Sequence, residues 1–438
     1  MSRQEVLSSS GKLSTGKEEK AMRQRWIVGL VVLLLGTGHA FAQALSVPGG
    51  DYHVPLGSEA RNGRLVFQTA DGSFRWWFDA RIQVDAAFYF DSKNPMSNGT
   101  VFRRLTYAMK TVLWKNWETE LDVDFAEAEL DLRDMWVKYR VPGTHLSVQA
   151  GNFKEPFGLE RLTSSRLLTF LERASVSNAF ALGRRIGAAA RYWNSYGQIT
   201  GAIMGHEAGT RIDKGTRDEG YSTNLRLTLA PVNRFGRNLH LGAAFAHKIP
   251  DAVSDLPENT IEIKARHETY VSDPKLLHTG DIRDVNYYLR YGSELLAVYG
   301  PFFLQSEAMW TTVERWYNKP PVDMKGGYAF VSWMVTGETR EYYIDEGEPG
   351  PVEAPKRAWG ALELAARASF LDLNDLGAGI HGGSSKQLML GVNYYPNRNI
   401  KLQCNYSVVD LDEYATRKGN LLGNDDHWFV QFRVQAVF

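Results

Sequence analysis

The chain has little of what marks several common classes of protein. Its single cysteine, Cys404, excludes an intramolecular disulfide and any metal site built from clustered cysteines. The 50 basic and 50 acidic residues cancel, which excludes a strongly basic nucleic-acid binder and an acidic disordered tail. No H-E-x-x-H, P-loop or G-x-S-x-G motif occurs, and the G-x-G-x-x-G at Gly377–Gly382 leads into an alternating segment instead of a helix. We therefore expect no catalytic residues, no metal and no cofactor.

The strongly apolar run near the N-terminus is too short to cross a membrane as a helix. It extends over Trp26–Leu35, follows two arginines, and is followed by small residues that end at Ala42. A spanning helix needs about 20 apolar residues, whereas this order of charged, apolar and small residues is typical of a secretory signal. We predict a signal peptide over residues 1–42, with Met22 as an alternative start, and an exported mature chain.

What the sequence does contain is a series of segments in which apolar and polar residues alternate. In residues 74–90 every even position is apolar, while the odd row carries Arg75, Asp79 and other polar residues. Residues 427–438 repeat the pattern and end on Phe438. Because successive side chains of a strand point to opposite faces, each segment predicts a strand with one apolar and one mostly polar face.

About sixteen such strands can be traced along the chain. Some connections are tight, such as Trp114–Asn116, and others are long, such as Phe153–Gly183, which is typical of outer-membrane barrels. No Pro/Ser linker divides the chain into the two or three domains that soluble sandwiches of this length would form. The predicted strands are residues 74–90, 100–113, 117–126, 130–140, 144–152, 184–193, 196–206, 220–230, 238–248, 284–299, 301–315, 326–338, 358–372, 384–395, 399–411 and 426–438.

These strands predict an all-β fold, a transmembrane antiparallel β-barrel in the outer membrane. Arg or Lys at the bilayer midplane costs about 2 to 4 kcal/mol, so the apolar row should face lipid and the polar row the lumen. The last strand must pair with the first, because an open edge in lipid leaves backbone groups unsatisfied. We expect a flexible leader over residues 43–72 and the barrel over residues 73–438. The terminal Phe438 resembles the signature read by the barrel-assembly machinery, an expected partner.

The long connection after Gly151 reads "GNFKEPFGLERLTSSRLLTFLERASVSNAFALGRRIG" and is rich in both leucine and arginine. Such a segment is a poor solvent loop, and we expect residues 153–183 to fold into the lumen and narrow it. Thr163–Ser165 resembles the start of a helix over residues 166–171. Guanidinium groups stay charged and donate in a bidentate fork, so a positive lumen would concentrate anions. The alternative is that these charges pair with carboxylates of the wall, such as Asp122.

Several short stretches together resemble the phosphate-selective porin O and P family. They follow one another in order over about residues 70–438, and the resemblance implies a sixteen-stranded barrel, a trimer, inward-folded loops and a narrow anion path lined by arginines and lysines. The family's double arginine is matched by Arg103 and Arg104, of which alternation lets Arg104 face the lumen, whereas Arg103 needs a bulge or a place at the rim. The stretches are "FRRLTYAMK" (102–110), "GNFKEPFGLERLTSS" (151–165), "LER" (171–173), "TGETREY" (336–342), "RAWGALELAARASFLDLND" (357–375) and "LGVNYYPNRNIKLQCNY" (390–406).

We therefore predict an outer-membrane channel for passive diffusion of small anions, with phosphate or polyphosphate suggested by the resemblance. The expected partners are outer-membrane lipid, small anions and further copies of the chain in a homotrimer, without nucleic acid. A general non-selective porin and a plugged barrel with a structural or adhesive role remain alternatives. An outer-membrane enzyme is disfavoured, because no pair of nucleophile and base stands out. The candidate pore-lining residues are Arg81, Arg104, Lys154, Arg161, Arg166, Arg173, Arg184 and Arg185.

Overall fold

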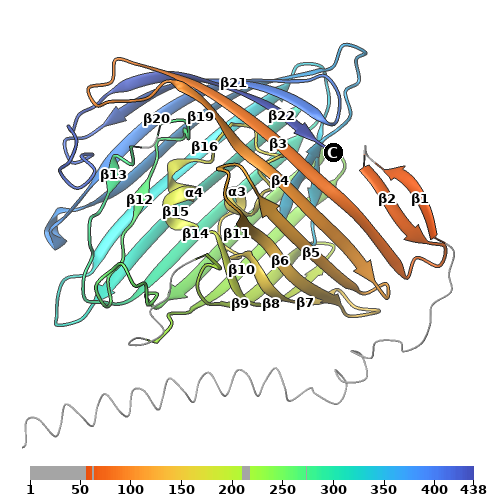
Figure 1. Cartoon of the computed structure of the whole chain (residues 1–438), viewed down its shortest axis with the longest axis horizontal. Coiled ribbons are helices and arrows are strands. Elements are labelled where there is room, and N and C mark those ends of the chain that lie inside the picture. Colours follow the sequence, from red (N-terminus) through yellow and green to blue (C-terminus); the bar gives the residue numbers. More distant parts are fainter. Residues whose placement is uncertain (1–55, 62–63, 210–217, 273) are drawn as a thin grey trace, which may run out of the picture. The chain divides into compact units, whose positions relative to one another are not determined.

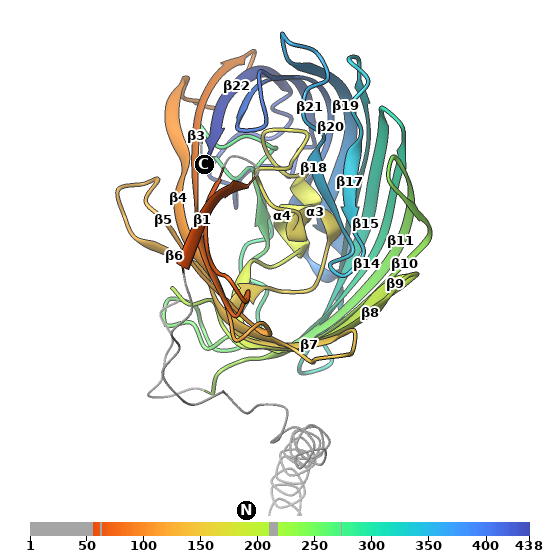
Figure 2. The same ribbon diagram turned by 90° about the vertical axis from the view of Figure 1, so that its right-hand side faces the viewer.

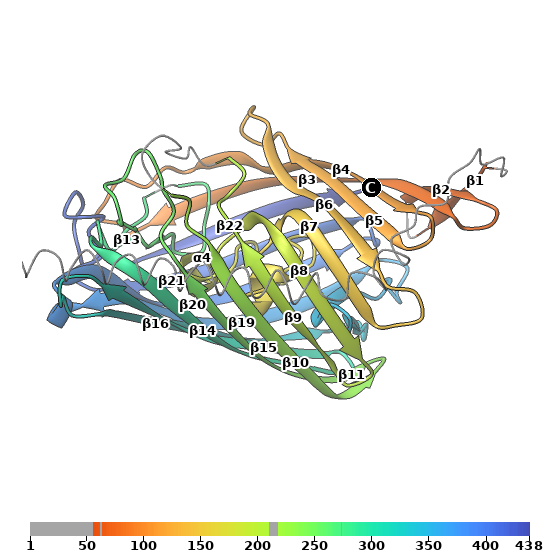
Figure 3. The same cartoon turned by 90° about the horizontal axis from the view of Figure 1, so that it is seen from below.

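The computed structural model of the chain describes residues 56–61, 64–209, 218–272 and 274–438. The predicted signal peptide over residues 1–42 lies outside this part. Sixteen antiparallel strands form a closed barrel, shown in Figure 1, so the predicted fold class is confirmed. Seen from below in Figure 3, the strands are tilted across the wall.

The barrel strands follow one another around the wall in chain order, and each predicted strand is present. The largest displacement concerns the strand predicted at residues 326–338, which lies at Val322–Met334. The strands are β3 (Phe74–Phe90), β4 (Gly99–Leu113), β5 (Trp117–Asp124), β6 (Asp131–Arg140), β7 (Leu146–Lys154), β8 (Arg184–Asn194), β9 (Gly197–Met204), β10 (Ser222–Arg234), β11 (Arg237–Lys248), β14 (Val285–Tyr299), β15 (Phe302–Arg315), β16 (Val322–Met334), β19 (Ala361–Asp375), β20 (Ile380–Tyr395), β21 (Ile400–Leu411) and β22 (His427–Val437).

The two rows of each strand face the two sides that alternation predicts. In β22 the apolar Phe432 and Val434 are 43% and 55% exposed on the outer surface, whereas Arg433 between them is 1% exposed. The inward row is not purely polar, since Met309 and Phe330 also point into the interior and pack there. The apolar inner positions therefore predict that something apolar fills the lumen beside them.

The barrel closes where β22 pairs with β3. The register places Arg433 opposite Asp85, and the backbone N–H and C=O groups of Phe438 bond those of Ala80 at 2.9 and 3.0 Å. No backbone edge is left open along this seam, which is what a bilayer requires. The final aromatic residue is thus part of the wall.

A hairpin at the N-terminal side differs from the flexible leader expected over residues 43–72. β1 (Leu56–Arg61) pairs with β2 (Arg64–Thr69), and β2 pairs in turn with β3. The register places Phe67 opposite Trp76 of β3, a stretch that lies beyond the pairing of β22. β3 extends beyond the stretch that pairs with β22, and the hairpin pairs with part of the edge of β3 that remains.

The segment after β7 folds into the lumen, as predicted. It carries the short helices α3 (Leu159–Leu162) and α4 (Ser175–Phe180), which lie inside the ring of strands in Figure 2. α3 begins where the carboxylate of Glu307 on β15 accepts the backbone N–H groups of Leu159 and Glu160 at 2.6 and 2.8 Å. Capping by a wall residue satisfies amides that have no partner inside so short a helix.

Two further connections reach the inner row of the wall. The segment between β11 and β14 carries β12 (Lys264–Ala265) and β13 (Leu277–His278), and the segment between β16 and β19 carries β17 (Arg340–Tyr343) and β18 (Glu348–Val352). Among the described residues, the connections at one end of the barrel are tight turns, with the exception of the long connection between β16 and β19. The expected arrangement, with short turns at one end and long loops at the other, therefore has one exception. A 3-10 turn, η1 (Leu376–Ala378), joins β19 to β20.

No helix in the described part of the chain is long and apolar enough to cross a membrane.

Candidate functional site

Two adjacent arginines of β4 enter the lumen because the strand is bulged between them. Gln83 of β3 lies opposite Arg104 and Val84 lies opposite Phe102, so Arg103 is the extra residue of a β-bulge. Arg104 is 5% exposed, and the side chain of Arg103 is 14% exposed. The bulge that alternation required for Arg103 is present, and both guanidinium groups lie inside.

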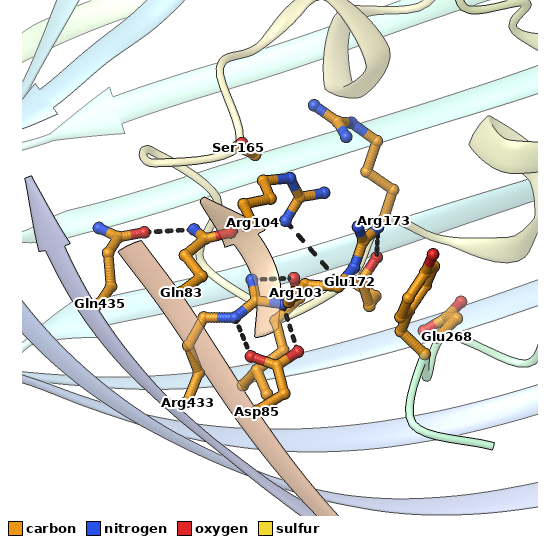
Figure 4. A network of polar contacts seen from close by, with 12 residues as sticks. Gln83, Asp85, Arg103, Arg104, Ser165, Glu172, Arg173, Glu268, Arg433 and Gln435 are labelled. Atoms are coloured by element: carbon orange, nitrogen blue, oxygen red, sulfur yellow. Dashed lines mark hydrogen bonds and ion pairs between the residues drawn. The ribbon is translucent and has the colours of Figure 1, made fainter. Parts of the chain in front are cut away.

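Glu172, on the loop after β7, ties these arginines to the seam. Nε and Nη2 of Arg103 donate to its two carboxylate oxygens at 2.7 and 3.0 Å, and Arg433 donates to one of them at 2.8 Å. Arg104 lies 3.9 Å away, and Arg433 also forms a bidentate pair with Asp85, as Figure 4 shows. Burial would raise the pKa of Glu172, but the arginine charges lower it well below its usual value. An ionised Glu172 thus clamps the loop.

The loop crosses the lumen without the helix predicted over residues 166–171, and that prediction is wrong. Its backbone groups find partners on the wall instead. Nζ of Lys401 donates to the carbonyl of Leu168 at 2.8 Å, and Nη1 of Arg433 donates to that of Leu171 at 2.6 Å. These partners lie more than 200 residues away, so a local helix signal could not compete with them.

Three cations gather around Leu162–Thr163. Nζ of Lys154 donates to the carbonyl oxygens of both residues, and Nη2 of Arg173 donates to the Thr163 carbonyl at 2.7 Å. Arg161 lies in the helix that ends there. Burial, with the positive charges of Arg173 and Arg184, lowers the pKa of Arg161 to about 9. Burial and the neighbouring positive charges thus both oppose the charged form of Arg161.

Two wall residues complete this set. Nη1 of Arg81 donates to Oγ of Ser165 at 2.6 Å, and Lys401 donates to loop carbonyls. None of the five side chains forms an ion pair within 4.0 Å with a carboxylate of the described residues. We refer to them below as the cation set: Arg81, Lys154, Arg161, Arg173 and Lys401.

The other predicted site residues are compensated, as the alternative interpretation expected. Arg104 donates to the side-chain oxygen of Gln83 at 2.7 Å and lies near Glu172. The remaining three form ion pairs with the wall or a neighbouring loop: Arg166 with Asp79 at 2.7 Å, Arg184 with Asp134 at 2.5 Å and Arg185 with Asp251 at 2.9 Å. The eight predicted residues therefore divide into compensated and uncompensated groups, a division that the sequence did not show.

Sequence reasoning missed further basic residues of the lumen. Arg367 on β19 donates to the carbonyl of Glu172 at 3.0 Å and bonds the carboxylate of Glu268. Its inward position could have been read from alternation in the predicted strand. Arg340, by contrast, was placed in a loop without periodicity, so nothing indicated that it reaches Glu363 at 3.0 Å.

The aromatic ring of Tyr270 also contacts Arg103. The guanidinium of Arg103 lies 3.8 Å from the ring centroid of Tyr270, and that of Arg266 lies 4.5 Å from it. The hydroxyl of Tyr270 donates to Glu127. Tyr270 thus forms cation–π contacts with both arginines.

One group of carboxylates could in principle hold a metal ion. Glu120, Asp122 and Asp134 have carboxylate oxygens within 4.8 Å of one another. Glu120 already pairs with Lys110 at 2.9 Å and Asp134 with Arg184 at 2.5 Å. The trio therefore serves as negative charge opposite the basic residues of the lumen.

Comparison with known proteins assigns the chain to a family. A model described as "Phosphate-selective porin O and P" matches residues 78–438. The chain belongs to this family. Porin O of Pseudomonas aeruginosa is 23% identical over 448 residues, which cover 94% of this porin and 98% of Porin O. An uncharacterized protein of Caulobacter vibrioides is 27% identical over 361 residues, covering 80% of this porin and 71% of that protein.

Solved structures agree on the fold of this porin. The anion-selective porin from Comamonas acidovorans matches with a TM-score of 0.52 and 13% identity, covering 83% of this chain and 100% of its own. A loop-deletion variant of OmpT from Vibrio cholerae matches with a TM-score of 0.53 and 8% identity, covering 84% and 100%. Family and fold place this porin in an outer membrane of the Gram-negative type, as a channel rather than an enzyme.

Proposed function

We propose that this porin is an anion-selective diffusion channel. The observation that carries the proposal is the cation set. Its side chains bind neutral hydroxyl and carbonyl oxygens. Ion pairs with carboxylates would cancel their positive charge, whereas these neutral partners do not. A fixed positive charge in a narrow lumen attracts anions and repels cations. The proposed pathway includes Arg81, Lys154, Arg161, Arg173 and Lys401, with smaller contributions from the compensated Arg104, Arg166, Arg184 and Arg185.

Phosphate or polyphosphate is the proposed physiological anion. The family description and the likeness to Porin O support it. The chemistry of the set fits as well, because guanidinium and ammonium groups donate charge-assisted hydrogen bonds to oxyanions. Lys154 and Arg173 both donate to the carbonyl oxygen of Thr163. A phosphate oxygen is the same kind of acceptor and could take its place.

Single-channel recording in planar bilayers tests this function. In a salt gradient the reversal potential should show preference for the anion, and millimolar phosphate should reduce the chloride current by occupying the pathway. Cation preference would overturn the proposal. Anion preference without any effect of phosphate would leave a general anion porin, and the absence of current steps would favour a plugged barrel.

Replacing Arg81 by Glu tests the cation set directly. The substitution changes the local charge by two units, and we expect the anion-to-cation permeability ratio to fall by roughly tenfold, since each charge contributes on the order of 0.6 kcal/mol at about 7 Å in a water-like dielectric. Arg75→Glu, on the same inner row but in contact with Trp77 near the strand end, is the matched control and should change the ratio far less. Equal effects of the two variants would remove Arg81 from the pathway.

Three further features of this porin are proposed. One of the solved OmpT structures is described as a trimer form, with a TM-score of 0.51 and 8% identity, and we propose a homotrimer that chemical cross-linking of the purified porin would detect. We also propose cleavage of a signal peptide after Ala42, which N-terminal sequencing of the mature protein checks, and insertion by the barrel-assembly machinery.

A further inference from the structure

The β17–β18 hairpin brings negative charge into a basic part of the lumen. It belongs to the long connection after β16, which starts at the end of the barrel where the other described connections are tight turns. The hairpin lies inside the ring of strands in Figure 2, and the carbonyls of its turn, Asp345–Gly347, accept hydrogen bonds from wall arginines. The hairpin therefore approaches the pathway from the end opposite to the loop that carries α3 and α4.

Arginines from three wall strands bind the turn. Nη1 of Arg191 on β8 donates to the carbonyl of Asp345 at 3.3 Å. Arg226 on β10 donates to the carbonyls of Glu346 and Gly347 at 3.0 and 2.8 Å. Arg140 on β6 adds an ion pair with the Asp345 carboxylate at 3.5 Å. The oxygens of the turn thus accept hydrogen bonds that these arginines would otherwise donate to a permeating oxyanion.

The approach of the hairpin to the wall is close. Gly347 has a φ of +64°, a conformation that favours glycine, and an added Cβ would lie 2.9 Å from Oγ1 of Thr228. The hydroxyl of Tyr342 lies 2.7 Å from Nδ1 of His240 on β11. The hairpin is therefore seated on the wall by its backbone as well as by its charges.

The hairpin also meets the loop from the other end. Nη1 of Arg340 donates to the carbonyl of Leu167 at 2.9 Å, and its Nη2 lies 3.2 Å from the hydroxyl of Thr169. The cavity between hairpin and loop is about 10 Å³, which is close to the volume that one water molecule needs. Loop and hairpin therefore pack directly against each other inside the lumen.

The carboxylates of the hairpin face basic residues. Burial opposes the ionisation of Glu346, but the charges of Lys138, Arg191 and Arg140 prevail and lower its pKa. Glu348 lies near Glu346 and near cations of the wall, among them Lys154. The negative charge of the hairpin therefore acts on the same lumen as the cation set.

We propose that the β17–β18 hairpin is a built-in counter-anion that limits the anion selectivity of the channel, with Asp345, Glu346 and Glu348 as specificity-determining residues. The proposal rests on the proposed anion conduction. The carboxylates of the hairpin cancel part of the positive field. Its turn binds Arg191 and Arg226, so these two arginines are not available to the permeating ion. The hairpin thus weakens anion binding and makes release of the anion easier. A channel must bind its ion weakly enough to let it leave.

The test measures reversal potentials of the full-length porin in planar bilayers at about 0.1 M salt, where charges are screened over about 10 Å. Glu346→Gln should raise the anion-to-cation permeability ratio roughly two- to threefold, and the triple variant D345N/E346Q/E348Q should raise it further. Glu353→Gln is the matched control, because Glu353 lies in the same connection but pairs with Lys356 at 3.0 Å. Heat-dependent migration in SDS gels confirms that each variant folds.

The outcomes separate this proposal from the proposed function. If the unaltered porin prefers cations, anion conduction itself fails. If it prefers anions and the hairpin variants have the same permeability ratio as Glu353→Gln, the hairpin is not a counter-anion. A lower ratio in the triple variant would also overturn it. Should the triple variant fail to fold, the single Glu346→Gln variant decides, because its carboxylate forms no ion pair within 4.0 Å among the described residues.

Discussion

The loop that carries α3 and α4 and the β17–β18 hairpin enter the same lumen from opposite ends and differ in charge. Residues 155–183 carry three arginines and three glutamates, whereas residues 340–352 carry one arginine and four carboxylates. The loop contributes Arg161 and Arg173 to the cation set and is anchored by the carboxylate of Glu172, which is buried among arginines. The hairpin contributes carboxylates and is anchored through main-chain carbonyls that accept from wall arginines. Both regions accept hydrogen bonds from wall side chains at their backbone carbonyls, but their ion pairs differ: those of Glu172 in the loop are buried, whereas that of Asp345 in the hairpin is partly exposed.

This difference predicts unequal costs when an anchor is removed. Glu172→Gln leaves Arg103 and Arg433 facing a neutral group, and breaking a buried ion pair in this way costs about 3 to 5 kcal/mol. Asp345→Asn loses a pair whose side chains are 32% and 35% exposed, which is worth about 0 to 1 kcal/mol. Urea titration of the purified porin in detergent, followed by tryptophan fluorescence, gives both free energies of unfolding. Similar losses would contradict the contrast.

The pH dependence of selectivity is the next largest expected effect. Burial, with the negative charge of Glu346, raises the pKa of Glu348 to about 7. Glu348 is therefore mostly neutral below pH 7 and becomes negative as the pH rises through this value. We expect the anion-to-cation permeability ratio to fall about twofold between pH 6 and pH 8. Reversal potentials measured at both pH values check this, and Glu348→Gln should make the change smaller. A change of the same size in that variant would assign it to other groups of the lumen.

The smallest effect is expected from the aromatic neighbour of Arg103. Tyr270→Leu removes a ring that lies 3.8 Å from the Arg103 guanidinium, a contact worth about 0.5 to 2 kcal/mol. Because Glu172 still holds Arg103 by two hydrogen bonds, the reversal potential should change little while the urea midpoint falls slightly. Tyr270→Phe keeps the ring and should behave like the unaltered porin. A large change in selectivity would show that Tyr270 itself lines the pathway.

Alternation predicted the wall well because each strand reports its own two faces. The bounds of β3 and the need for a bulge at Arg103 could be read from a few consecutive residues. The lumen was harder to predict, because its contacts join distant parts of the chain. Nothing near residues 166–171 shows that Lys401 will bind their backbone, and Arg340 lies in a stretch without periodicity. The division between cations with and without an ion pair depends on such distant contacts, so it could not be predicted from the sequence.

The seam between β22 and β3 has a consequence for the order of assembly. Arg433 and Asp85, which pair across it, are 348 residues apart in the chain. During export β3 emerges before the other strands of the ring and β22 emerges last, so the part of the β3 edge that pairs with β22 must stay unpaired until almost the entire polypeptide has crossed. A chain that ends a few residues early would lose the two hydrogen bonds between Phe438 and Ala80 together with the last pairs of the seam, and its ring would stay open at that end.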